Sequence, residues 1–244
     1  MLREPLTADT EISAVYRLLC ALYNTPYIFE SYEGFVNTYR LADFYRALPA
    51  LSHSLDSAMQ KSPEFTKQIE FESEDLFRMA KKLHHPVLFR ECLVYLVAKT
   101  HSLDEIPEIS RFDDDRELKH ALMTGFRSIS VLQNKVDNKI LRLIGRNPRF
   151  VRFLTENADN WILSKRAASY YREILEFLAR DARGREINNS WKVLGDLLEN
   201  KLVLARKDIH VGDFVPWKEY DCNYFFCAEI RDEDLPWDQN SVDW

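Results

Sequence analysis

The chain has 244 residues and a net charge of −6 at pH 7, with 46% hydrophobic and 30% charged residues. Its length allows one large core or two small ones, and only six glycines and nine prolines favour a helix-rich protein over a disordered one. The acidic balance argues against bulk attraction to nucleic acid or an anionic membrane. No apolar run approaches the ~20 residues that span a bilayer. The first residues, MLREPLTADTE, lack the apolar centre of a signal peptide, so we expect an intracellular, soluble protein.

The N-terminal part of the sequence predicts a series of short helices. In the first, apolar residues recur at steps of three and four and form one stripe: Ile12, Val15, Tyr16, Leu19, Leu22 and Tyr23. Asn24-Thr25-Pro26 ends this helix, because proline cannot continue it. A second helix carries Leu41–Tyr45, and Pro49 opens a third. Two further helices, around residues 76–83 and 87–97, form a hairpin joined at His84-His85-Pro86.

The centre of the chain predicts longer helices. Asp113-Asp114-Asp115 begins an apolar pattern of about 30 residues that ends at Asn147-Pro148. A second long pattern runs from about Asn160 to Asp181, and a short apolar helix, Phe150–Leu154, lies between the two. We expect the long helices to pack as an antiparallel pair within a bundle. A heptad coiled coil is the competing interpretation, but the seam is short and lacks clean flanking charges.

The pattern becomes less regular beyond residue 189. Residues 191–198 predict one more helix, and residues 211–217 and 224–230 have the character of extended segments, the second because its side chains alternate. The last fifteen residues, IRDEDLPWDQNSVDW, form an irregular acidic tail with two tryptophans. We therefore predict a mostly α-helical protein with three parts, residues 1–101, 102–230 and 231–244.

Three motifs resemble a known interaction fold. A helix ending in Leu22-Tyr23, a loop and a helix with Leu-Ala-Asp-x-Tyr resemble the second half of a BTB/POZ domain. More narrowly, three runs are similar to those of fungal BTB proteins: RLADFYRALP (Arg40–Pro49), KKLHHPVLFREC (Lys81–Cys92) and LPWD (Leu235–Asp238). The resemblance implies that residues 1–101 are a partial BTB-like helical unit with a helical hairpin after it. BTB domains dimerise and recruit partners such as cullin-type ubiquitin ligases or transcriptional regulators. The resemblance therefore implies a non-catalytic adaptor or scaffold in the cytoplasm or nucleus, without naming its partner.

The sequence departs from a complete BTB domain at its beginning. Nothing before Thr10 supplies the strand and first helices of that fold. The chain is either truncated or a divergent protein that keeps the helical half, so self-association stays open. Without its sheet, the first helix would lack a partner layer and expose apolar side chains. We predict an interaction surface at Tyr16, Leu19 and Tyr23.

Acidic and histidine clusters suggest chemistry but have simpler interpretations. Asp113-Asp114-Asp115 lacks the glycine and the later glutamate of a calcium-binding EF-hand loop, and suits a helix N-terminus. His84-His85 has no HExxH arrangement around it and no third metal ligand in view. Pairs such as Glu173 and Glu176 are expected by chance among 39 acidic residues.

Cysteines and glycines give no stronger signal for chemistry. Cys222 and Cys227 have no partners at zinc-finger spacing, and no glycine-rich phosphate loop or GxSxG elbow is present. We therefore expect no catalytic residue, no metal and no cofactor. The alternative from another class is a small helical enzyme that uses a metal or carboxylates.

A basic stripe offers a further alternative. Arg142, Arg146, Arg149 and Arg152 recur at helical spacing, with Phe150 and Phe153 interleaved. Nucleic-acid binding would use such a face, but a solvated helix face, or one that docks the acidic tail, fits the charge balance better. We predict that Asp232, Glu233, Asp234 and Asp238 pair with the stripe, while Trp237 and Trp244 bury against the bundle.

Overall fold

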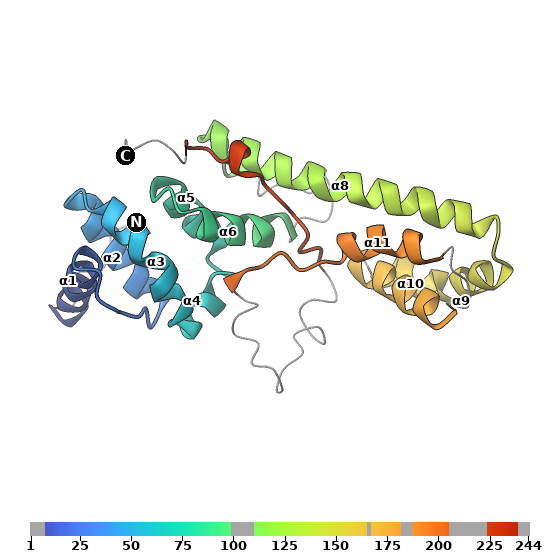
Figure 1. Ribbon diagram of the computed structural model, residues 1–244, viewed down its shortest axis with the longest axis horizontal. Coiled ribbons are helices and arrows are strands. Elements are labelled where there is room, and N and C mark those ends of the chain that lie inside the picture. Colours follow the sequence, from blue (N-terminus) through green and yellow to red (C-terminus); the bar gives the residue numbers. More distant parts are fainter. Residues whose placement is uncertain (1–7, 99–109, 165–166, 182–186, 205–223, 239–244) are drawn as a thin grey trace. The chain divides into compact units, whose positions relative to one another are not determined.

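The computed structural model describes residues 8–98, 110–164, 167–181, 187–204 and 224–238 (Figure 1). These residues are mostly α-helical and include no strand, which confirms the predicted fold class. In chain order the elements are α1 (Ala8–Leu22), α2 (Tyr32–Phe44), α3 (Leu48–Gln60), α4 (Pro63–Gln68), α5 (Ser73–Lys82), α6 (Pro86–Ala98), α8 (Arg116–Ile144), α9 (Pro148–Ser164), α10 (Ala167–Asp181), α11 (Ile187–Leu197) and the 3₁₀ helix η3 (Asp232–Asp234).

The chain divides into two compact units. The first unit comprises Met1–Tyr95, Leu202–His210 and Arg231–Trp244. The second comprises Leu96–Lys201 and Val211–Ile230. The division falls within α6, and the first unit combines the beginning of the chain with its end.

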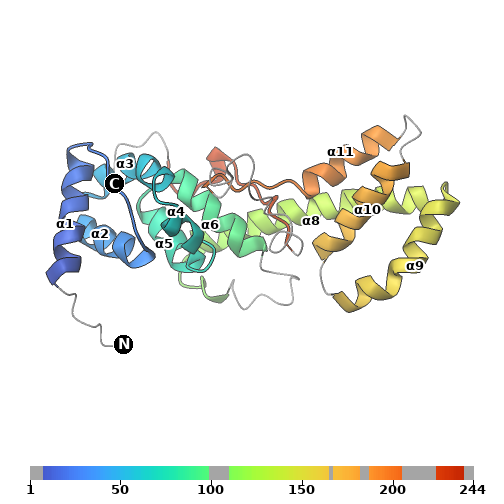
Figure 2. The same ribbon diagram turned by 90° about the horizontal axis from the view of Figure 1, so that it is seen from below.

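In the first unit, α1 packs against α2 and α3 (Figure 2). Three buried phenylalanines from different segments form the centre of this packing: Phe29, Phe35 and Phe65, with ring centroids 5.0–5.5 Å apart. Tyr27 meets the ring of Phe29 edge-on, and its hydroxyl shares a 2.7 Å hydrogen bond with Ser54 of α3. The segment between α1 and α2 therefore contributes two aromatic anchors to the core, Tyr27 and Phe29, while Ile28 between them is exposed.

Three helices of the first unit end in the same way. Asn24, Arg46 and His84 follow α1, α2 and α5 with φ of 51°, 55° and 48°. In each case the next residue donates its backbone N–H to a carbonyl five residues back, at 2.7–3.0 Å. This is the αL C-cap, in which one residue in the left-handed conformation follows the helix and nearby backbone N–H groups satisfy carbonyls at the helix end. The turns at Asn24 and His84 explain where the predicted first and fourth helices end.

In the second unit, α8 begins where the acidic cluster predicted it. The Asp115 carboxylate caps the helix and accepts the backbone N–H groups of Glu117 and Leu118 at 3.2 and 3.1 Å. Such a cap satisfies donors that the first turn leaves unpaired. The helix then continues for 29 residues and packs mainly against α11.

The second predicted long helix, Asn160–Asp181, is confirmed over Ala167–Asp181, whereas residues 160–164 belong to the preceding helix. Its first part belongs to α9, which begins at Pro148 after the Asn147 side chain accepts two backbone N–H groups. Its last part is the separate helix α10. Phe153 of α9 stacks on Phe177 of α10 with ring centroids 4.3 Å apart.

The extended prediction for residues 224–230 is wrong as a strand. These residues are irregular, although the carbonyl of Phe226 accepts the backbone N–H of Lys201 at 2.9 Å. Burial does not follow the alternation, since Phe226, Cys227 and Ala228 are buried one after another. Residues 211–217 and Trp244 lie outside the described residues.

Candidate interaction surfaces

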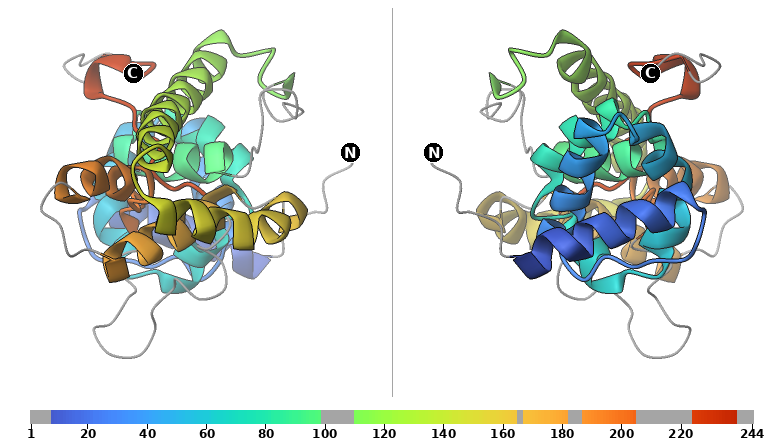
Figure 3. Two further views of the ribbon diagram at one scale, coloured as in Figure 1. Left: turned by 90° about the vertical axis from the view of Figure 1, so that its right-hand side faces the viewer. Right: turned by 90° about the vertical axis from the view of Figure 1, so that its left-hand side faces the viewer.

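The apolar stripe of α1 faces solvent. Tyr16, Leu19 and Tyr23 are 62%, 47% and 77% exposed, and the other stripe residues, Ile12, Val15 and Leu22, are exposed as well. The right-hand view of Figure 3 shows α1 on the near side of its unit. The expected exposure of this stripe, which we call the α1 stripe, is therefore confirmed.

The opposite face of α1 carries smaller side chains and one arginine. Ala14, Leu18 and Ala21 are buried, and they allow the close packing of α1 on α2 and α3. Arg17 lies among them, with Nε donating a 3.0 Å hydrogen bond to the carbonyl of Ile28. The buried face therefore combines tight packing with a hydrogen bond that fixes the segment after the helix.

Arg17 also lies beside a glycine of α2, at a distance where a Cβ would make an ordinary van der Waals contact. Its guanidinium lies 3.6 Å from the Glu30 carboxylate, and a Cβ added at Gly34 would sit 3.5 Å from its Nη1. The planar guanidinium thus lies flat over the start of α2. This orients α1 with its larger apolar side chains outward.

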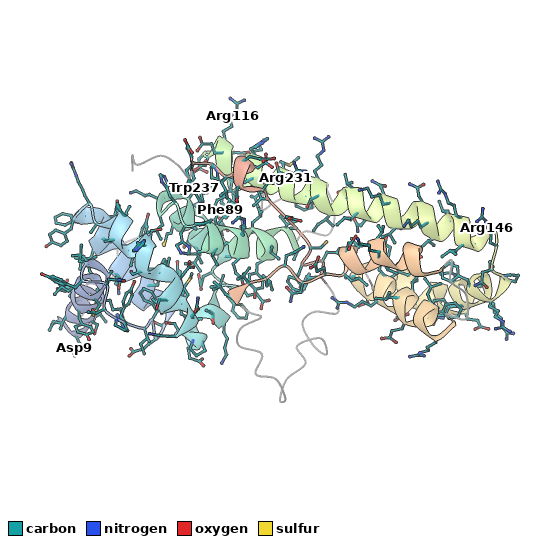
Figure 4. The ribbon with its side chains drawn as sticks, viewed as in Figure 1. Asp9, Phe89, Arg116, Arg146, Arg231 and Trp237 are labelled. Carbon is teal, nitrogen blue, oxygen red and sulfur yellow. The ribbon has the colours of Figure 1, made fainter. Side chains whose placement is uncertain are left out.

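The acidic tail docks on the turn between α5 and α6, within the first unit. Trp237 stacks on His84 with ring centroids 5.5 Å apart and planes within 5°. The same indole meets Phe89 edge-on at 5.1 Å, and Figure 4 shows these two rings side by side. Asp232 forms an ion pair with Arg90. We call His84, Phe89 and Arg90 together the α5–α6 surface.

The tail contacts differ in part from the predicted ones. Trp237 does pack against helices, but the arginine that pairs with Asp232 is Arg90, and Glu233 pairs with Arg231 at 3.1 Å. Asp234 and Leu235 belong to the same turn, with Leu235 buried.

The predicted basic stripe lies on the second unit. Arg142, Arg146 and Arg149 are exposed near the junction of α8 and α9, and Arg152 pairs with Glu156 at 2.7 Å. Figure 4 labels Arg146 at the end of α8. Pairing of Asp234 or Asp238 with this stripe stays a prediction.

Glu91 is a buried carboxylate that sequence reasoning missed. It is 1% exposed on α6 and accepts the backbone N–H of Val203 at 2.7 Å and that of Leu204 at 3.2 Å. A buried charge is tolerated when hydrogen bonds compensate its lost hydration. Glu91 thus joins a late segment of the chain to the first unit, and it sits one position after Arg90, which holds the tail.

The two adjacent histidines make different structural contacts. His85 is buried, and its Nδ1 accepts the backbone N–H of Leu88 at 3.1 Å, so it caps α6. Its Nε2 therefore carries the proton and lies 3.3 Å from the Asp56 carboxylate of α3. His84 is half-buried beneath Trp237, and this burial lowers its pKa from the ordinary value. Both imidazoles are thus engaged in structure.

The remaining candidate groups are placed as follows. The exposed side chains of Glu176 and Arg180 on α10 pair at 3.1 Å, and Asp113 pairs with Lys119. Cys227 is buried, which raises the pKa of its thiol to about 12. Within the described ranges, no three His, Cys, Asp or Glu side chains gather in a way that could hold a metal ion.

Arg17, Arg90 and Glu91 were not singled out from the sequence. A signal existed for Arg17, because a long cation on the small-residue face of a helix needs partners. No local signal existed for Glu91, whose partners lie more than 100 residues away.

Comparisons with protein-family models, curated proteins and solved structures found no match. In the part of the chain that the structure describes, no helix has the length and apolar character needed to cross a bilayer.

Proposed function

We propose that this chain is a non-catalytic protein–protein interaction protein of the BTB/POZ-like type, acting as an adaptor or scaffold in the cytoplasm or nucleus. The observation that carries the proposal is the α1 stripe. Six apolar side chains, each 44–77% exposed, line one face of a single helix.

The size of the α1 stripe supports a docking role. Six side chains exposed to this extent present on the order of 700 Å² of surface, whereas the largest apolar patch on a typical monomer covers roughly 300–600 Å². Leaving so much apolar area in water costs free energy that a partner would recover on binding. Two tyrosines in the stripe suit this use, because they combine a large apolar ring with a polar hydroxyl.

The resemblance to BTB proteins supports the same class. Its motifs fall on α2, the start of α3, the α5–α6 turn and the tail, all within the first unit. The partner classes implied by that resemblance, a cullin-type ligase or a transcriptional regulator, belong to the proposal. Self-association through the α1 stripe is the other outcome that the experiment must separate.

The proposal is tested by photo-crosslinking of the full chain in fungal cells. The photoreactive residue p-benzoyl-phenylalanine replaces Tyr16, an exposed aromatic on the α1 stripe. A matched chain carries it at Phe71, which is 68% exposed elsewhere in the same unit. We expect a discrete crosslinked protein from position 16 and none from position 71.

A second change tests whether the crosslink depends on the α1 stripe. Leu19→Asp places a charge on the stripe without touching the buried face of α1, and we expect it to abolish the crosslink. An adduct of twice the chain mass would identify a second copy. Absence of any adduct, or equal adducts at both positions, would contradict the proposal.

A further inference from the structure

The tail has the features of a bound peptide rather than of core structure. Between residues 231 and 238 the only regular element is the three-residue turn η3, closed by a 3.1 Å backbone hydrogen bond from Asp234 to Arg231. Its described contacts with α5 and α6 come from side chains, namely the Trp237 indole and the Asp232 carboxylate. Asp232 itself remains 74% exposed.

The described contacts of this segment are distinct in kind. The Trp237 indole contacts two rings. It stacks face to face on His84 and meets Phe89 edge-on. Arg90 selects a carboxylate five positions before the tryptophan. Leu235, buried two positions before the tryptophan, is a second apolar anchor. Charge, aromatic shape and spacing together define what the surface accepts.

The contact is small enough to open. One half-buried indole and one leucine bury on the order of 300 Å², well below the ~800 Å² per partner of a stable interface. Such a contact persists because the segment belongs to the same chain and is held at high effective concentration. A segment of the same chemistry with a few additional contacts would displace it.

We propose that the α5–α6 surface is a binding site for an acidic segment of a partner protein, with a leucine and a tryptophan spaced as in DxxLxW, and that the chain's own residues 231–238 occupy this site in cis. The tail thereby acts as a built-in competitor. This site is separate in sequence from the α1 stripe, and its test involves neither Tyr16 nor Leu19. Failure here is therefore distinguishable from failure of the proposed function.

The experiment uses the full chain and a fluorescein-labelled peptide with the sequence of residues 231–238, RDEDLPWD. Binding is followed by fluorescence anisotropy to wild type and to Trp237→Ala, which removes the cis anchor. We expect the variant to bind the peptide at least tenfold more tightly than wild type does. A peptide in which alanine replaces the tryptophan is expected not to bind.

Charge reversal tests the ion pair between Arg90 and the Asp232 position of the peptide directly. In the Trp237→Ala background, we expect Arg90→Glu to weaken peptide binding at least tenfold. A peptide that carries the change Asp232→Arg at its second residue is then expected to restore binding to this Arg90→Glu variant. The matched control is Lys67→Glu, another exposed cation of the same unit paired with an acid, which should leave binding unchanged.

Several outcomes would overturn the proposal. Peptide that does not bind Trp237→Ala, or that binds regardless of Arg90, excludes this site. If Trp237→Ala unfolds, the exposed change Asp232→Lys is used in its place to weaken the cis contact. Peptide binding to Asp232→Lys that is no tighter than to wild type would then show that the tail is core structure. A wild-type dimer that dissociates on adding peptide would assign the surface to the tail of a second copy.

Discussion

Glu91 accepts a 2.7 Å hydrogen bond from the backbone N–H of Val203, a residue 112 positions later in the chain. The carboxylate is almost completely buried, and it reaches the next N–H as well. A single side chain of α6 therefore secures a distant segment to the first unit.

Replacing Glu91 should release that segment. Glu91→Leu leaves two backbone N–H groups without acceptors, and we expect it to cost about 3 kcal/mol of stability. Glu91→Gln should cost less, because one amide oxygen still accepts. Hydrogen–deuterium exchange at residues 202–204 reports the release directly. Glu117→Gln on exposed α8 serves as the control, and equal protection in Glu91→Leu and wild type would contradict the role.

His85 should behave as a helix cap. His85→Ala removes the acceptor for the Leu88 N–H, and we expect a loss of about 1 kcal/mol, as for other N-cap deletions. His85→Asn should keep most of the stability, since asparagine is a preferred cap. Urea unfolding of the three proteins gives the comparison, with the exposed His53→Ala as control. A loss in the asparagine variant as large as in the alanine variant would instead assign the whole effect to the contact with Asp56.

Arg46 should be replaceable with a gain in stability. Its φ of 55° is strained for a residue with a Cβ, and the side chain is exposed. We expect Arg46→Gly to stabilise the chain by about 0.5–1 kcal/mol, because glycine adopts this conformation without strain. The control is Lys61→Gly at the end of α3, where φ is −100° and no gain should follow. Melting temperatures of both variants decide the matter.

Protonation of His84, which stacks on Trp237, should lower the stability of the folded chain in acid. Burial lowers the pKa of His84 in the folded protein, so the unfolded chain binds the proton more readily. Stability contributed by the neutral imidazole is then present above the unfolded pKa, about 6.5, and is lost as pH falls towards the folded value. His84→Asn keeps a side chain that tolerates positive φ but does not titrate.

We expect wild type to lose more stability than His84→Asn between pH 7.5 and 5, measured as the shift in urea midpoint. Since other groups titrate in both proteins, the difference between the two pH profiles is the informative quantity. Parallel profiles would mean that His84 contributes nothing to the acid response.

Local signals in the sequence predicted the local structure well. The Asp115 cap and Pro148 were recognisable because capping and proline effects depend on a few neighbouring residues. The exposed α1 stripe was also anticipated, although from the resemblance rather than from its period. Period alone indicated only that one face of the helix is apolar, and the structure shows that the buried face is the one with Ala14, Arg17 and Ala21.

Contacts between distant segments could not be predicted in this way. The choice of Arg90 as the partner of Asp232 depends on where the tail meets α6, and many arginines in the sequence offered the same charge. The choice of Phe177 of α10 as the partner of Phe153 of α9 is likewise a tertiary contact. Helical periodicity carries no information about either choice.

The discontinuous first unit has a consequence for synthesis on the ribosome. Helices α1–α5 emerge early, but the segments that Glu91 and Arg90 hold are translated more than 100 residues later. At roughly 5–20 residues per second, the nascent chain waits on the order of ten seconds with these positions unfilled. During that interval the buried carboxylate and the Phe89 ring lack their final covering, so a chain that stops before residue 202 would be a substrate for chaperones or proteases.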